Sequence, residues 1–234
     1  MKKNRRKIAH RTQISRIIVI PYLSKKPMSI VENGILGSFS GRIGPVVGAK
    51  WKGKQTMRMR PNYPKNREFS EKQLAQQMKM KLISPFTKKL KNLLKYTFEA
   101  GQGQHGKSQA IGYIMQSAIV GEYPNLSLDF SQVLISRGRI PKPVGYSTTR
   151  ENDQLIYQWE DNSKTGSASA QDKAILVTYC PKLNMAIYTD EKGKRGDKMA
   201  ILDVDLFKDQ KIHCWLAFVR KNGEVSDSVY CGER

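Results

Sequence analysis

One run of residues in this sequence has the spacing of a phosphate-binding loop. Residues 101–108, GQGQHGKS, fit the pattern G-x-x-x-x-G-K-S and are followed by a predicted helix. In such a loop the backbone N–H groups cradle phosphates, Lys107 reaches the outer phosphates and Ser108 holds magnesium. The loop must leave a buried parallel strand, whereas residues 91–100 have the pattern of an amphipathic helix end. The structural context expected from the sequence therefore argues against nucleotide binding at this run.

Other arrangements that support catalysis are sparse. The three histidines have no ligand spacing with the cysteines, and the Walker-B-like run 199–203 ends in Asp203, which we expect to face solvent. Three cysteines are too few for a disulfide framework, and they form no CxxC pair. We predict no metal, no cofactor and no enzymatic activity, and we expect reduced, structural thiols at Cys180, Cys214 and Cys231.

A regular alternation of basic and apolar residues indicates binding instead. Between residues 50 and 60 every basic residue has an even number, whereas Trp51, Met57 and Met59 have odd numbers. In a strand, this period of two places charge on one face and apolar groups on the other. Glycine recurs up to Gly53 and predicts tight turns between short strands. If the turn at Gly53 has an odd number of residues, the two strands that flank it carry their basic side chains on the same face and form one basic patch. If the number is even, the basic side chains are divided between the two faces.

A helical segment follows these strands. Ser70 opens the spacing of a capping box, and apolar residues then recur at helical intervals. Pro85, with Ser84 as its cap, predicts two helices or one kinked helix. In the second half of this segment, one helix face carries three lysines, Lys88, Lys91 and Lys95. This face is either an ordinary solvated surface or part of the basic patch. Opposite these lysines lie Phe86, Leu90 and Leu94.

The basic positions predict a surface that binds a polyanion, with DNA or RNA as the leading candidates. Lysine and arginine contact phosphates, while an exposed aromatic ring stacks on bases. In the alternative hypothesis, the aromatic residues of this region form a small core. The predicted contact residues are Lys50, Trp51, Lys52, Lys54, Arg58, Arg60, Lys88, Lys91 and Lys95.

Net charge is distributed unevenly along the 234 residues. Residues 1–27 hold nine Lys/Arg and no acid, residues 28–107 hold sixteen against four, and residues 108–234 hold sixteen against sixteen. This split predicts two parts, of which the first faces an acidic partner. The basic leader is a nucleic-acid arm, a targeting segment or an extension upstream of a start at Met28. Its apolar run contains Pro21 and is too short to cross a bilayer, so we expect a cytoplasmic protein without a membrane partner.

The neutral C-terminal part has a different pattern. A helix over 108–120 and one or two strands within 126–136 precede seven short apolar runs. Turn segments separate these runs, which is typical of a β-sandwich with Trp159 in its core. The predicted fold class is α+β, with a small N-terminal β-ribbon plus helices and then a seven-stranded sandwich. The seven runs are 146–149, 155–159, 174–180, 185–189, 199–204, 212–219 and 225–230.

Two resemblances accompany these patterns. The motif NGILGSFSGRIG at 33–44, with weaker matches at 51–53, 58–61, 73–76, 121–124, 136–138 and 172–174, resembles a domain-of-unknown-function family of Bacteroidota. The resemblance covers nearly all of the chain from Met28 to Gly232, and chains of this kind commonly begin near Met28. Residues 141–234 are similar to a fibronectin type III module, through Trp159 and the hairpin at 218–226. Such modules bind partners or separate neighbouring domains, and they catalyse no reaction of their own.

These observations predict three segments: a basic leader (1–27), a basic strand-helix module (28–140) and a fibronectin III-like sandwich (141–234). We expect a non-enzymatic protein whose basic module docks on a polyanion, while the sandwich contacts protein. The first alternative is a structural subunit of a phage-like or surface assembly, whose basic face meets an acidic neighbour. The second alternative is the P-loop nucleotide-binding protein.

Overall fold

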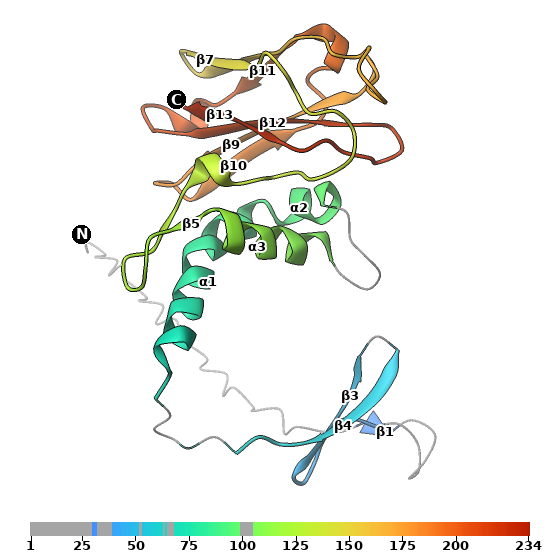
Figure 1. Cartoon of the computed structure of the whole chain (residues 1–234), viewed down its shortest axis with the longest axis vertical. Helices are drawn as coiled ribbons and strands as arrows, with labels where there is room; N and C mark the ends of the chain where they lie inside the picture. The colour runs from blue at the N-terminus through green and yellow to red at the C-terminus, as the bar shows by residue number, and fades with distance from the viewer. Residues whose placement is uncertain (1–29, 32–38, 52, 63, 65–67, 99–104) are drawn as a thin grey trace, which may run out of the picture. The chain divides into compact units, whose positions relative to one another are not determined.

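A computed structural model describes residues 30–31, 39–51, 53–62, 64, 68–98 and 105–234 (Figure 1). The leader 1–27, Lys52 and residues 101–104 of the GQGQHGKS run lie outside this described part. Contacts divide the chain into two compact units, Met1–Lys65 and Asn66–Arg234. This division differs from the boundary expected at residue 140, because the helices pack on the C-terminal strands.

The first unit holds a four-stranded antiparallel sheet in the order β1-β2-β3-β4. Its strands are β1 (Ile30–Val31), β2 (Phe39–Ile43), β3 (Val46–Trp51) and β4 (Lys54–Met59). Trp51 pairs with Lys54, so the turn between β3 and β4 has two residues. Gly53 has a φ of +79° in this turn, a conformation that glycine adopts without strain. We call residues 39–59 the ribbon.

In the second unit, helix α1 (Glu71–Lys89) begins where the sequence predicts. The Gln73 N–H donates to Ser70 Oγ at 3.4 Å, and the Ser70 N–H donates to Gln73 Oε1 at 3.2 Å. These reciprocal bonds satisfy two backbone donors that the first turn leaves without helical partners. The predicted capping box is therefore confirmed.

Pro85 lies inside α1 and does not start a second helix, so the predicted cap at Ser84 is wrong. Ile83 and Phe86, on either side of the proline, are both buried in one core, and this packing keeps the helix continuous. Helix α1 ends at Leu90 instead, and α2 (Lys91–Thr97) follows directly.

Helix α3 (Gly106–Ser117) starts two residues earlier than predicted and packs closely on α2. A Cβ at Gly106 would lie 2.6 Å from the carbonyl oxygen of Phe98 and 2.7 Å from that of Lys95. Only glycine permits so close an approach of two backbones. The segment 126–136, predicted as one or two strands, contains the short strand β6 (Ser127–Leu128) and the 3₁₀ turn η1 (Phe130–Gln132). Strand β6 pairs with β5 (Ile119–Val120), which follows α3.

The remainder of the unit is β-rich, and each of the seven predicted runs contributes to a strand or a bridge. The strands form two antiparallel sheets, in the orders β11-β8-β7 and β10-β9-β12-β13. The last run is shifted, because its first residue Val225 only bridges Val219, and β13 begins at Val229. The bounds are β7 (Ser147–Glu151), β8 (Gln154–Gln158), β9 (Lys173–Cys180), β10 (Met185–Thr189), β11 (Met199–Asp203), β12 (His213–Val219) and β13 (Val229–Glu233), with 3₁₀ turns η2 (Arg195–Asp197) and η3 (Asp205–Phe207).

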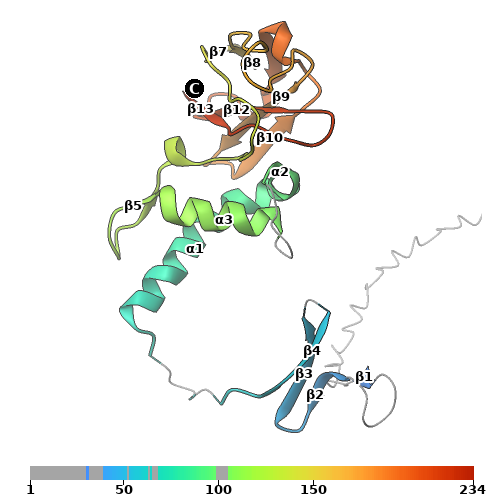
Figure 2. The same cartoon turned by 45° about the vertical axis from the view of Figure 1, so that its right-hand side comes forward.

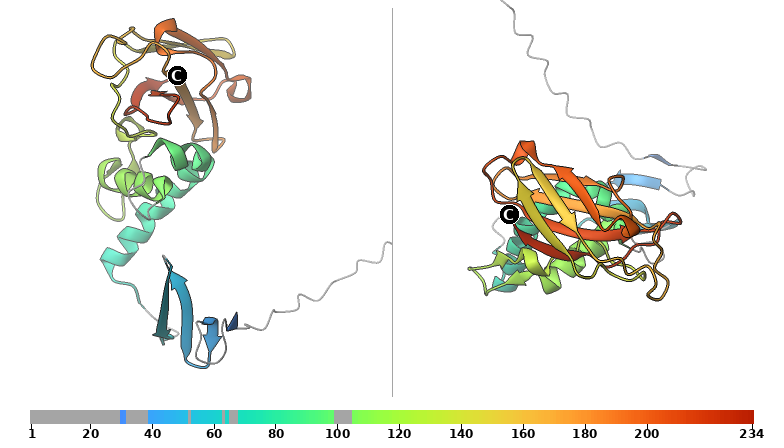
Figure 3. Two further views of the ribbon diagram at one scale, coloured as in Figure 1. Left: turned by 90° about the vertical axis from the view of Figure 1, so that its right-hand side faces the viewer. Right: turned by 90° about the horizontal axis from the view of Figure 1, so that it is seen from above.

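Two cores share the four-stranded sheet of this unit. On β9, Ile175 and Val177 pack in the core that includes the helices, whereas Ala174 and Leu176 pack in the core with the three-stranded sheet. Figures 2 and 3 show the resulting layers, with the helices on one face of the four-stranded sheet and β7, β8 and β11 on the other. Trp159 is buried in the second core, as predicted. The chain is thus α+β with a β-rich C-terminal part, and the helices belong to that part.

Candidate functional site

The ribbon has two chemically different faces. Cross-strand partners in an antiparallel pair point to the same side of the sheet, and neighbours along a strand point to opposite sides. Trp51 pairs with Lys54, and Val47 pairs with both Arg42 and Arg58. Because Val47 and Trp51 are four residues apart on β3, these five residues share one face. We call it the cationic face, and it also holds Ser40, Ala49 and Thr56.

Lys50 lies on the opposite face, because it precedes Trp51 on β3 and pairs with Gln55. The two-residue turn therefore splits the basic patch, which is the second of the two outcomes that the alternation allowed. Lys54 and Arg58 remain on the same face as Trp51. Lys52 lies outside the described residues.

Arg42 and Arg60 extend the cationic surface to the turn between β2 and β3. The Arg42 Nε donates to the Gly44 carbonyl at 3.0 Å, and the Arg60 N–H donates to the Pro45 carbonyl at 2.7 Å. Both arginines line one shallow hollow at this turn. Sequence reasoning missed Arg42, because only the pairing of β2 with β3 aligns it with Arg58.

Trp51 is an exposed aromatic residue, with 64% of its surface accessible. Phe69, after the ribbon, is about half exposed as well. In the part of the ribbon that the structure describes, Gly48 is the only buried residue. The alternative hypothesis, in which these aromatics build a small core, is therefore wrong for Trp51, most of whose surface is exposed.

The charge of the ribbon region is not offset by acids of its own. Residues 39–64 contain six Lys/Arg and no Asp or Glu. In the second unit, by contrast, Arg220 pairs with Asp172 and Glu224, and Lys211 pairs with Glu233. A surface of one sign without local counter-charges attracts ligands of the opposite sign.

The three predicted helical lysines belong to the second unit, and they do not share one hollow. Lys91 and Lys95, one turn apart on α2, line a hollow of about 280 Å³ with His105, Lys107 and Ser108 at the start of α3. Lys88 lines another hollow beside Pro85 and Asn184. Because α1 ends at Leu90, between Lys88 and Lys91, the three lysines lie on two successive helices.

The Gly-Lys-Ser of the P-loop-like run forms the first turn of α3. The described residues before it form α2 and a bridge at Phe98, as the helical pattern of residues 91–98 predicted. Gly106 serves the close contact between α2 and α3, so this glycine has a packing role. Asp203 is exposed, as expected, and lies 3.8 Å from Lys192.

The three cysteines lie in the interior of the second unit. All three thiols are free and buried, and burial raises the pKa of Cys214 to about 11 and that of Cys231 to about 12. A buried thiol of such high pKa is a poor nucleophile at neutral pH. Among the described residues, no group of three or more His, Cys, Asp or Glu is placed to hold a metal ion.

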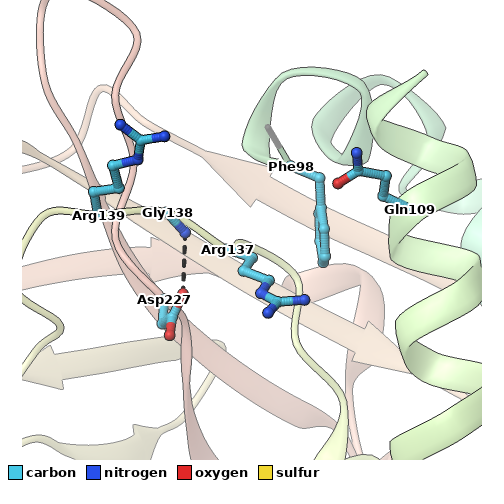
Figure 4. Close-up of a pocket in the computed structure, with 6 residues that line it drawn as sticks. All are labelled: Phe98, Gln109, Arg137, Gly138, Arg139 and Asp227. Carbon is cyan, nitrogen blue, oxygen red and sulfur yellow. Dashed lines mark hydrogen bonds between the residues drawn. The ribbon is translucent and has the colours of Figure 1, made fainter. Parts of the chain in front are cut away.

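A further polar hollow, of about 550 Å³, lies where α3 meets the loops of the sheet, and sequence reasoning missed it. Figure 4 shows the Arg137 and Arg139 side chains at this hollow, on the chain segment that passes Asp227. The Gly138 N–H donates to Asp227 Oδ1 at 3.0 Å, and the Arg137 N–H donates to the Thr97 carbonyl at 2.9 Å. These bonds tie the segment to the loop before β13 and to the end of α2. Its lining combines guanidinium groups with a carboxylate and so lacks the single sign of the cationic face.

Comparison with protein families matches residues 38–232 to a family of unknown function, DUF6266. The match spans most of the chain, so the chain belongs to this family. Comparisons with curated proteins and with solved structures each found no match. In the described residues, none of the helices has the length and apolar character needed to span a bilayer.

Proposed function

We propose that this protein binds a polyanion through the cationic face of the ribbon, with nucleic acid as the leading candidate. The observation that carries the proposal is that Arg42, Lys54 and Arg58 lie on the same face as the exposed Trp51, in a region without acids. Cations contact phosphates whatever the base sequence, and an exposed indole stacks on an unpaired base. This combination favours a single-stranded target over a closed duplex.

The number of cations sets the expected salt dependence. Four basic residues lie on or beside the cationic face: Arg42, Lys54, Arg58 and Arg60. Each phosphate contact to a single strand changes the slope of log affinity against log salt by about −0.7. Four contacts therefore predict a slope of roughly −3.

Two alanine variants on opposite faces test this assignment. Arg58→Ala removes a charge from the cationic face, and Lys50→Ala removes the same charge from the other face. Fluorescence anisotropy with a labelled single-stranded oligonucleotide, at two salt concentrations, should show weaker binding and a shallower slope for Arg58→Ala alone. Equal losses in both variants would show a general charge effect, and binding without salt dependence would rule out the proposal.

Substitution of Trp51 tests the stacking part of the proposal. Trp51→Ala should weaken single-strand binding by about 1–3 kcal/mol, whereas Trp51→Phe keeps a ring and most of the affinity. Because Trp51 is exposed, neither change should alter the thermal unfolding of the second unit. Unchanged affinity of Trp51→Ala would remove the indole from the contact surface.

We propose further that the two facing sheets form a fibronectin III-like sandwich that contacts protein. In support, the seven strands divide into β7, β8 and β11 on one side and β9, β10, β12 and β13 on the other. Trp159 packs edge-on against Phe218 between them, with ring centroids 5.8 Å apart. A module of this kind offers a binding surface and catalyses no reaction of its own.

Two other functions make different predictions. In a structural subunit of a phage-like or surface assembly, the cationic face would bind an acidic protein neighbour, and Arg58→Ala would weaken that assembly without any effect on oligonucleotide binding. In a P-loop protein, nucleotide would raise the unfolding temperature, and Lys107→Ala would abolish the shift. The packing role of Gly106 favours the polyanion proposal over the P-loop.

A further inference from the structure

The face of the ribbon opposite the cationic face is apolar. Met57 pairs with Gly48, Met59 pairs with Val46, and Val46 pairs with Ile43. By the alternation along β2, Phe39 lies on the same side as Ile43. Consistent with this, a Cβ at Gly48 would lie 2.6 Å from the Phe39 ring. We call this surface the apolar face, and its members are Phe39, Ile43, Val46, Met57 and Met59.

The large side chains of this face are strongly exposed in the single chain. The exposed fractions are 48% for Ile43, 67% for Met57 and 68% for Met59. A small sheet needs to bury one face to be stable, and exposed apolar patches mark interaction sites. Since the described part of the ribbon buries only Gly48, a partner that covers the apolar face would supply the missing core.

The charge distribution indicates what kind of partner fits. An acidic partner would be drawn to the other face, where Arg42, Lys54 and Arg58 lie. Among the described residues of the apolar face, Lys50 is the only charged one, and it lies near the β3–β4 turn at one end. Two apolar faces can therefore meet while the positive charges of both ribbons point outward, away from each other.

We propose that two copies of this chain associate through the apolar faces of their ribbons. Two identical sheets have the same twist, which is the condition for aligned face-to-face packing. A two-fold axis places the same surface on both partners, so a neutral apolar face is complementary to itself. The flexible methionine side chains adapt to the facing surface. The dimer presents two cationic faces outward, and the proposal does not depend on whether those faces bind nucleic acid.

The molecular mass in solution provides the first test. Light scattering on the full chain should give twice the 26.6 kDa of one chain, and the double variant Met57→Gln/Met59→Gln should give the mass of a monomer. Leu206→Gln is the matched control, because Leu206 is an exposed apolar residue of the second unit. It should remain dimeric. A wild-type monomer at every concentration, or a dimer that survives the double substitution, would overturn the proposal.

Thiol protection provides a second test that does not depend on the stability of the double variant. The native cysteines are buried, so a thiol introduced by Met57→Cys or Thr56→Cys is the reactive one. These neighbouring positions lie on opposite faces of β4. The Met57→Cys thiol should be protected from alkylation at high protein concentration and exposed on dilution, and the Thr56→Cys thiol should react rapidly throughout. Protection that does not change with concentration would mean that residues of the same chain cover the face, and equal protection of both thiols would exclude a face-specific contact. Either result overturns the proposal.

Discussion

His213 is a half-buried base whose environment disfavours its charged form. Its Nδ1 lies 2.8 Å from the Tyr230 hydroxyl, and its ring stacks on Phe130 with centroids 4.1 Å apart. Burial lowers the pKa of His213 below 6.5, and the nearby Lys211 adds to this effect, while Glu233 opposes it. The neutral imidazole is therefore the form that the folded protein accommodates.

This lowered pKa makes stability depend on pH in a known direction. As pH falls through 6.5, the unfolded chain binds a proton before the folded chain does, so the free energy of unfolding decreases until pH passes below the folded pKa. His213→Gln should remove this part of the pH dependence. Urea unfolding of the wild-type protein and the variant at several pH values between about 7 and 5 measures this pH dependence. The same change of unfolding free energy with pH in both proteins would contradict the prediction.

Asp172 accepts from two arginines in the interior of the second unit. Its carboxylate lies 3.2 Å from the Nε of the fully buried Arg195 and 3.4 Å from that of Arg220. The Arg195 guanidinium also donates to the Pro141 carbonyl at 3.0 Å and stacks over the Phe218 ring at 3.9 Å. The network joins the segments before β7 and β9 to η2 and to the end of β12.

Removal of this carboxylate leaves a buried cation without its partner. Asp172→Ala should lower the free energy of unfolding by about 3–5 kcal/mol, measured by urea titration followed by tryptophan fluorescence. Asp203→Ala is the control, because its pair with Lys192 is exposed, and it should cost less than about 1 kcal/mol. Similar effects of the two changes would show that burial does not set the strength of these pairs.

Helix α3 contains two glycines with opposite expected responses to alanine. At Gly106 an added Cβ would clash with backbone oxygens of α2, whereas at Gly112 nothing lies within 4 Å. Gly106→Ala should therefore destabilise the second unit by about 1–3 kcal/mol, and Gly112→Ala should stabilise it by roughly 0.4–1 kcal/mol. Thermal unfolding compares the two variants. A harmless Gly106→Ala would remove the packing explanation for the Gly-Lys-Ser of this run.

Across the whole molecule, the shared sheet should make residues 66–234 unfold as one cooperative body. Strands β9 and β12 contribute to both cores, so neither core can form without the sheet. Leu94→Ala in the helical core and Leu155→Ala in the core between the sheets should each lower the stability by about 2–5 kcal/mol and shift the same transition. Circular dichroism and tryptophan fluorescence should give coincident curves, and two separate transitions would show independent cores.

Local patterns in the sequence predicted the elements well, because a few neighbouring residues decide them. The hydroxyl of Ser70 begins α1 through a bond three residues away, and the short apolar runs 174–180 and 212–219 became strands. At Pro85 the sequence allowed two helices or one kinked helix, and the helix continues, because the burial of Ile83 and Phe86 in a distant core outweighs the local preference of proline for a helix start.

The candidate site depended on information of longer range. The alternation at residues 50–60 predicted that charge and apolar groups separate, but the number of turn residues decided that Lys50 lies apart from Trp51, Lys54 and Arg58. Arg42 joined them only through the pairing of β2 with β3. Pairing register depends on hydrogen bonds between strands, which no single strand encodes.

Composition and periodicity alone establish an uneven charge, an α+β chain and a basic alternating strand region, since these follow from residue types and their spacing. The two faces of the ribbon, the packing of α1, α2 and α3 on the four-stranded sheet, and the separation of Lys88 from Lys91 and Lys95 required the folded chain. They depend on contacts between residues far apart in sequence, where turn geometry and burial in a shared core select one arrangement among several that the local pattern permits.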